Sequence, residues 1–113
     1  MSLRALRDLI ESSSRKFAPG VLELVNLYCN LKFKQDYLAA LTERPECIVE
    51  ILKKLYTPDV AELIIYEIFT KPIVEITGRG DPRELARLAT RNLELFKDEV
   101  KKLLETIVST THS

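Results

Sequence analysis

Hydrophobic side chains recur every three or four positions along most of this chain, which is the spacing of one face of an α-helix. The first such segment covers about residues 3–17 and ends where Ala18 precedes Pro19, because the residue before proline is pushed out of the α conformation. Three further segments with the same spacing follow, at about 19–31, 35–43 and 45–55. The pattern therefore predicts helices throughout the first half of the chain.

The segment at 19–31 is apolar over an unusually wide arc. Its hydrophobic residues include Leu24, Leu27 and Leu31, and its polar positions form a narrow stripe. A surface helix normally carries a broader polar face. The sequence therefore predicts that this helix is mostly buried.

Capping residues followed by proline mark the beginnings of two further helices. Thr57 stands before Pro58, and Asp81 stands before Pro82. Each pair places a side-chain oxygen at the N-cap and a proline at the first helical position. Glu84, three residues after Asp81, resembles the second member of a capping box. We expect these helices at about 57–69 and 81–108.

The segment at 60–69 is apolar almost all round, which is typical of a helix in the centre of a fold or in an oligomer interface. Pro72 follows it, and we expect the chain to break or kink there because proline lacks an N–H group. The short apolar run at 73–76 fits either another helical turn or an extended piece. The glycines on both sides of Arg79 mark a flexible loop.

Together these segments predict an all-α, compact, single-domain bundle of five to six helices with a long C-terminal helix. We place the domain at residues 1–108 and a polar, flexible tail at 109–113. A chain of 113 residues is long enough to bury a core without a metal or a disulfide. Three glycines and five prolines are too few for a turn-rich β-sandwich.

The 17 basic and 17 acidic residues give the chain a formal net charge of zero. This balance argues against bulk electrostatic binding to nucleic acid or to an anionic membrane, both of which favour a basic excess. No apolar run approaches the length of about 18 residues that a membrane-spanning helix needs. The N-terminus also lacks the apolar region of a signal peptide. We therefore expect a cytoplasmic protein with no membrane partner.

Amide side chains are scarce beside the charged ones. The chain has one glutamine and three asparagines, whereas 30% of its residues are charged. Ion-pair networks stabilise proteins more at high temperature, and amides are heat-labile. This bias predicts a thermophilic source.

Candidate catalytic groups are few. The single histidine, His112, falls in the predicted tail, and the cysteines do not cluster at the spacing of a zinc site. Cys29 and Cys47 lie on apolar faces, which favours core thiols; a redox pair or disulfide requires their two helices to bring them together. No phosphate-loop or dinucleotide fingerprint occurs. The sequence thus indicates no catalytic residues, no cofactor and no metal site, and leans away from an enzyme.

An arginine row is the most distinctive feature of the predicted last helix. Arg83, Arg87 and Arg91 stand four residues apart, Arg79 lies in the loop before them, and we call these four the arginine row. Like charges at this spacing destabilise a helix by roughly 0.2–0.5 kcal/mol per pair, and a helix N-terminus disfavours cations. We expect the row to face acids within the chain, an acidic protein partner or nucleic-acid phosphate. The candidate acids within the chain are Glu43, Glu46, Glu50, Glu84 and Glu94.

The sequence supports three functional hypotheses. The first is a non-enzymatic protein-interaction or regulatory module, either self-associating or bound to a protein partner, because catalytic chemistry is missing and apolar residues are abundant. The second is a nucleic-acid-associated protein that uses the arginine row. The third is a small-ligand binder or enzyme with a tyrosine-lined pocket. The candidate pocket residues are Tyr28, Tyr37, Tyr56 and Tyr66.

Overall fold

The structure is a computed structural model that describes the backbone of residues 3–112 and the side chains of residues 3–107. Within this range the chain is all-α, as predicted, and contains no strand. The segments in chain order are α1 (Leu3–Phe17), α2 (Val21–Phe33), α3 (Tyr37–Glu43), α4 (Pro45–Leu55), α5 (Pro58–Ile64), η1 (Ile65–Thr70), α6 (Lys71–Thr77), α7 (Pro82–Arg91) and α8 (Leu93–His112). The segment η1 is a π-helical turn between α5 and α6.

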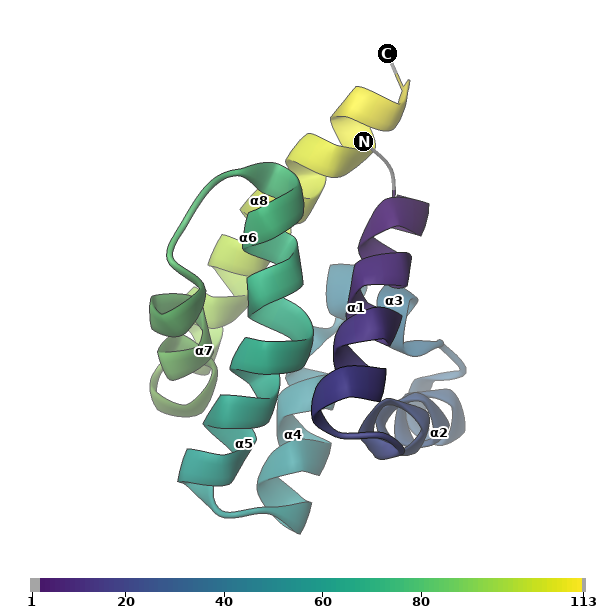
Figure 1. The fold of residues 1–113 in the computed structure, drawn as a ribbon, viewed down its shortest axis with the longest axis vertical. Helices are drawn as coiled ribbons and strands as arrows, with labels where there is room; N and C mark the ends of the chain where they lie inside the picture. The colour runs from purple at the N-terminus through teal and green to yellow at the C-terminus, as the bar shows by residue number, and fades with distance from the viewer. Residues whose placement is uncertain (1–2, 113) are drawn as a thin grey trace.

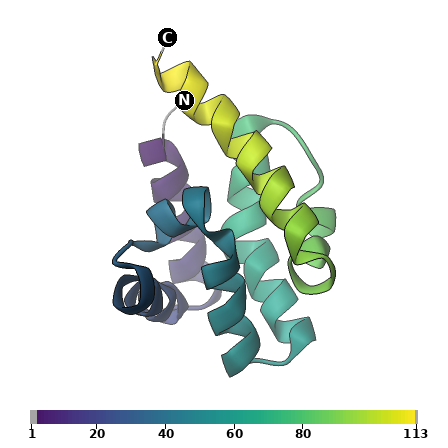
Figure 2. The same cartoon turned by 180° about the vertical axis from the view of Figure 1, so that it is seen from behind.

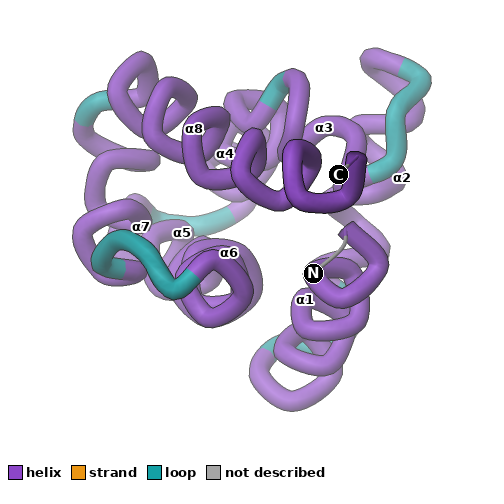
Figure 3. Tube along the Cα trace, turned by 90° about the horizontal axis from the view of Figure 1, so that it is seen from above, coloured by secondary structure: helices purple, strands orange, loops and turns teal. Residues whose placement is uncertain are grey.

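The helices form two layers (Figure 3). One layer holds α1, α7 and the central rod, which consists of α5, η1 and α6; the other holds α2, α3, α4 and α8. The central rod is continuous and stands between α1 and α7 (Figure 1), and α8 runs diagonally across the molecule when it is seen from behind (Figure 2). With the rod counted as one helix, the described chain has seven helices, slightly more than the five to six predicted.

The central rod carries much of the core. Ile65, Ile68 and Phe69 of η1 and Ile73 of α6 are at most 1% exposed. The rod packs against α1 on one side and against α7 on the other. Most of the apolar segment at 60–69 therefore lies at the centre of the fold, which is one of the two places that its sequence indicates, whereas Val60 and Leu63 near its beginning are 42% and 47% exposed.

Pro72 does not end the helix, so of the two outcomes predicted there, a break and a kink, the break does not occur. The backbone N–H of Lys71 bonds to the carbonyl of Tyr66, five residues earlier, and this closes a wider turn than that of an α-helix. Proline has no N–H, and its ring crowds the preceding turn of a regular helix. A wider turn gives the ring more room, so that residues 73–76 continue as helix α6 and are not extended.

Asn92 divides the predicted last helix in two. Its backbone lies at φ −147° and ψ 80°, outside the helical region, so that α7 ends before it and α8 begins at Leu93. Its side chain accepts a hydrogen bond from the backbone N–H of Leu95 at 3.3 Å, as an N-cap does. The prediction of a single helix over 81–108 is therefore wrong. The long C-terminal helix is α8, and the predicted tail at 109–113 falls outside the described side chains.

Candidate functional site

The arginine row lies on the exposed face of α7 and in the loop before it. The guanidinium of Arg83 lies over the ring of Tyr66, with its central carbon 4.7 Å from the ring centroid. Arg87 donates a hydrogen bond to Glu84 at 2.8 Å, whereas Arg91 is exposed at the end of α7. Cation–π contact and ion pairing offset part of the repulsion between neighbouring arginines. Among the described side chains, Arg83 and Arg87 therefore have partners within the molecule.

Most of the candidate acids for the arginine row bind lysines instead. Glu46 and Glu94 pair with the same lysine of α8, at 2.9 and 3.6 Å between charged atoms, and Glu50 pairs with a lysine of α2 at 3.0 Å. Glu84, which lies on α7 itself, is the candidate that meets an arginine of the row among the described side chains. The expected pairing with acids of the same chain therefore occurs within α7 and involves Arg87.

A cleft of about 320 Å³ lies between α5 and α7 and is lined by Arg83 and Arg87. Asp59 and Glu62 line the same cleft. Two carboxylates beside two guanidinium groups leave the cleft without net charge, which weakens its attraction for nucleic-acid phosphates. Arg79 lines a different groove, between α7 and α8, so the structure does not gather the arginine row into one anion site.

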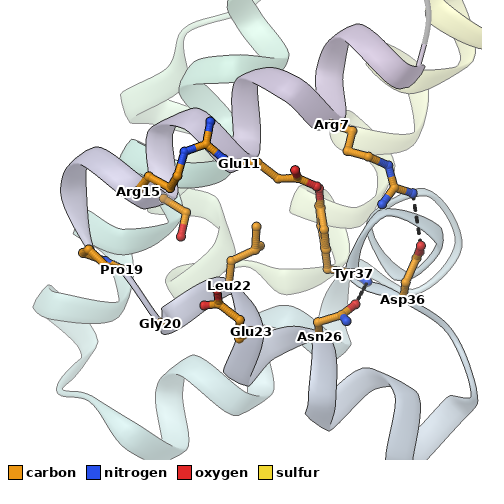
Figure 4. A pocket seen from close by; sticks show the side chains of 11 residues that line it. Arg7, Glu11, Arg15, Pro19, Gly20, Leu22, Glu23, Asn26, Asp36 and Tyr37 are labelled. Atoms are coloured by element: carbon orange, nitrogen blue, oxygen red, sulfur yellow. Dashed lines mark hydrogen bonds and ion pairs between the residues drawn. The ribbon is translucent and has the colours of Figure 1, made fainter.

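A second hollow, which we call the α1–α2–α3 pocket, has a volume of about 360 Å³ (Figure 4). It opens where α1 faces α2 and the beginning of α3. Eight of its lining residues carry polar or charged side chains: Arg7, Glu11, Ser14, Arg15, Glu23, Asn26, Asp36 and Tyr37.

Four contacts hold the walls of this pocket together. Arg7 pairs with Asp36 at 3.1 Å, and its guanidinium lies 5.6 Å from the centroid of the Tyr37 ring. The hydroxyl of Tyr37 donates a hydrogen bond to Glu11 at 3.1 Å. The backbone N–H of Tyr37 donates to the side-chain oxygen of Asn26 at 2.9 Å. The pocket is therefore shaped by interactions that join α3 to both α1 and α2.

The pKa values of the pocket side chains follow from these contacts. The backbone N–H of Ala39 and the guanidinium of Arg7 both donate to Asp36 and hold its pKa below the usual value. The same hydrogen bond to Asp36 raises the pKa of Arg7. Burial, together with the Glu11 carboxylate, raises the pKa of Tyr37, so its hydroxyl stays protonated and donates.

The α1–α2–α3 pocket can therefore meet ligand groups of either charge. Arg7 and Asp36 neutralise each other, whereas Arg15 is exposed and has no ion-pair partner among the described residues. Glu11 accepts the bond from Tyr37 and keeps lone pairs for another donor. The sequence named Tyr37 but not the others. Arg7 and Asp36 are 29 positions apart, and tertiary packing alone brings them together.

The predicted tyrosines do not share one pocket. Tyr37 lines the α1–α2–α3 pocket, and Tyr66 lines the cleft between α5 and α7. Tyr28 lies instead beneath two lysines, with the ammonium of Lys32 5.5 Å and that of Lys54 5.6 Å from its ring centroid. The described pockets that contain a predicted tyrosine therefore contain one each, and the predicted site lined by several tyrosines is not formed.

Helix α2 exposes a row of leucines, which corrects the prediction that this helix is mostly buried. Leu24, Leu27 and Leu31 are 38%, 55% and 77% exposed, and we call them the α2 stripe. The opposite face includes Val25 and Cys29 and is fully buried at both residues. Because the helix is apolar on both sides, periodicity alone did not tell which side meets the core.

The described residues contain no group of three or more histidine, cysteine, aspartate or glutamate side chains placed to hold a metal ion. In the same part of the chain, no helix combines the length and the apolar character that crossing a membrane requires. Comparisons with protein-family models, with characterised proteins and with solved structures found no match to this chain.

Proposed function

We propose that this protein is a non-enzymatic interaction module whose partner is a second copy of the chain, bound through the α2 stripe. The supporting observation is the exposure of Leu24, Leu27 and Leu31 along one helix. Single exposed leucines are common on protein surfaces, whereas a contiguous apolar row is typical of an interaction site. Their spacing of three and four residues is that of helices that pack side by side.

The charges beside the α2 stripe favour an antiparallel pair. Glu23 and Lys34 are both exposed; Glu23 lies in the first turn of α2, and Lys34 is the residue that ends the helix. In an antiparallel pair with twofold symmetry, Glu23 lies beside Lys34 of the second copy, and this contact occurs twice. A parallel pair would place like charges together.

The size of the α2 stripe sets the expected strength of the association. A standard stable interface buries about 800 Å² on each partner, which is more than three leucine side chains supply. We therefore expect a reversible dimer whose population depends on protein concentration. Such behaviour suits a regulatory module, because the fraction of dimer then reports the amount of protein.

Sedimentation velocity over concentrations from about 1 μM to about 1 mM tests the association, since weak dissociation constants fall in this range. The average mass should rise toward that of a dimer. Leu31→Glu should keep the chain monomeric, because the interface would bury the new charge without a partner. The matched control is Leu95→Glu, the same change at a leucine that is 41% exposed on α8, and it should leave the association unchanged.

A wild-type chain that stays monomeric over the whole range would contradict the proposal. Equal loss of association in the Leu95→Glu control would contradict the assignment to α2. A charge exchange tests the antiparallel register: Glu23→Lys should weaken the dimer, and adding Lys34→Glu should restore it. Without this recovery the antiparallel register is wrong.

A second candidate function is the binding of a small zwitterion, such as a free amino acid, in the α1–α2–α3 pocket. The supporting observation is that Arg15, which has no ion-pair partner among the described residues, and Glu11, which has lone pairs to spare, line one hollow. An arginine binds a carboxylate through two parallel hydrogen bonds, and a carboxylate accepts from an ammonium. The volume of about 360 Å³ matches the smaller ligand pockets of proteins.

Thermal unfolding with the 20 standard amino acids, added one at a time, tests this second function. A ligand should raise the midpoint of unfolding as its concentration increases. Arg15→Gln and Glu11→Gln should each abolish the rise. Arg4→Gln changes another exposed arginine of α1 that does not line the pocket, and it should keep the rise. No shift with any amino acid would contradict the function.

A further inference from the structure

Cys29 of α2 and Cys47 of α4 meet inside the core. Their sulfur atoms are 2.9 Å apart, and both residues are free thiols with no exposed surface. The sequence predicts core thiols, and the structure shows that the two helices also bring them together.

The two sulfur atoms of this pair lie near bonding distance. A disulfide bond is about 2.05 Å long, so the two sulfur atoms need to approach by less than about 1 Å. The residues are 18 positions apart, and the chain between them includes the whole of α3. A bond here would therefore close a loop around α3 and join α2 to α4.

We infer that Cys29 and Cys47 are a redox modification site that forms a reversible intramolecular disulfide. The oxidant is a small-molecule disulfide such as oxidised glutathione. One cysteine thiolate attacks it, forms a mixed disulfide and releases one glutathione thiol. The second cysteine then attacks the mixed disulfide and releases the other. Two electrons and two protons pass from the cysteines to glutathione, and one sulfur–sulfur bond replaces another.

The burial of the pair determines when this reaction occurs. Burial raises the pKa of both thiols, and the thiolate is the form that attacks a disulfide. Folded molecules therefore react slowly, through transient separation of α2 from α4. Chains that are still folding expose both cysteines and react readily.

Oxidation should fix α2 more firmly to the core. A disulfide reduces the conformational freedom of the unfolded chain. A bond that closes a loop of this length should therefore raise the free energy of unfolding. The α2 stripe lies on the opposite face of the same helix, so the bond leaves it uncovered. The redox site thus does not depend on the proposed self-association.

Intact-mass measurement of the full chain in glutathione buffers of defined ratio tests the inference. Samples are unfolded in denaturant, and free thiols are blocked with N-ethylmaleimide. Reduced chains should carry two maleimides, and oxidised monomers should carry none. Because the sequence has two cysteines, a disulfide within one chain joins these residues. Oxidation should also raise the midpoint of thermal unfolding by on the order of 10 °C, and dithiothreitol should reverse the rise.

Two reactive thiols that persist in fully oxidised glutathione, even after unfolding and refolding in that buffer, would overturn the inference. A product that consists of glutathione adducts or of disulfide-linked dimers would overturn it as well. Cys29→Ala and Cys47→Ala should each show no oxidation-dependent rise in the midpoint. The mass test uses the wild-type chain, so it stays decisive if these variants fold poorly.

Discussion

Lys34 has a backbone conformation that residues with a side chain seldom adopt. Its φ is 57°, in the left-handed region, where it ends α2 with its N–H bonded to the carbonyl of Asn30. Glycine is the usual residue here because it has no Cβ. Lys34→Gly should therefore raise the free energy of unfolding by about 1 kcal/mol, measured by urea unfolding. The control is Lys53→Gly, within regular helix α4, which should lower the free energy of unfolding by about 1 kcal/mol. A lower free energy of unfolding in both variants would contradict the prediction.

Asp36 gives the stability of the fold a pH dependence of definite sign. The N–H of Ala39 and the guanidinium of Arg7 hold its pKa below the usual value. A carboxyl whose pKa is lower in the folded chain stabilises the fold above its unfolded pKa of about 4. The contribution is lost as the pH falls through the folded pKa.

Replacing Asp36 should therefore have a pH-dependent effect. Asp36→Ala should lower the free energy of unfolding by about 1 kcal/mol at pH 7, because α3 loses its N-cap. The difference from wild type should shrink as the pH falls below about 4. Asp36→Asn keeps a capping oxygen and should lose less at pH 7. Urea unfolding at several pH values measures both, and a difference that is constant with pH would show that the charge has no part in the effect.

At the scale of whole elements, the sequence predicted helix beginnings well and buried faces poorly. The cap at Thr57 accepts from the N–H of Val60, and the cap at Asp81 accepts from two N–H groups, as expected from a signal contained in a few neighbouring residues. The exposed side of α2 depends on where α3 and α4 pack, which no local pattern contains. Likewise, the hydrophobic spacing continues through Asn92, so the pattern did not indicate that this residue caps a new helix.

The candidate sites follow the same division. Tyr37 and the arginine row could be named from the sequence because their residue types carry recognisable chemistry. Glu84 could also be named as a partner of the row, because it lies three residues from Arg87 on the same helix. The distant partners could not be named, since the α1–α2–α3 pocket combines three helices and the contact of Arg83 with Tyr66 crosses from α7 to the central rod. The thiol pair needed the same tertiary information, because α2 and α4 are separated by all of α3.

Thr70 ties the central rod to α7. Its hydroxyl is fully buried and donates a hydrogen bond to the carbonyl of Pro82 at 2.8 Å. Thr70→Val keeps the shape but removes this donor, so it should lower the free energy of unfolding by about 2 kcal/mol. Thr70→Ser keeps the hydroxyl and loses one methyl group, which should cost about 1 kcal/mol. Urea unfolding ranks the variants, and a larger loss for Ser than for Val would show that packing dominates over the hydrogen bond.

At the scale of the whole molecule, α2 connects the proposed activities. One of its faces holds the α2 stripe, another contributes Asn26 to the α1–α2–α3 pocket, and the buried face holds Cys29 beside α4. The central rod takes no part in these surfaces, and most of its residues between 64 and 73 are buried in the interior. The fold therefore separates a stabilising centre from an outer helix that carries the recognition surfaces.

This separation predicts that damage to the rod unfolds both layers together. Phe69 is 1% exposed and belongs to η1, the part of the rod that packs against both α1 and α7, so Phe69→Ala should lower the free energy of unfolding by about 3–5 kcal/mol. Phe17→Ala removes the same ring from a site that is 40% exposed and should cost less than about 1 kcal/mol.

Urea unfolding followed by far-ultraviolet circular dichroism and by tyrosine fluorescence measures both variants, because the chain has four tyrosines and no tryptophan. Tyr66 belongs to the rod, and Tyr28 and Tyr37 belong to the other layer. A single cooperative domain requires the two signals to change at the same urea concentration in wild type and in Phe69→Ala. Separate transitions would mean that α2, α3 and α4 unfold independently of the rod, because the two layers would then not share one core.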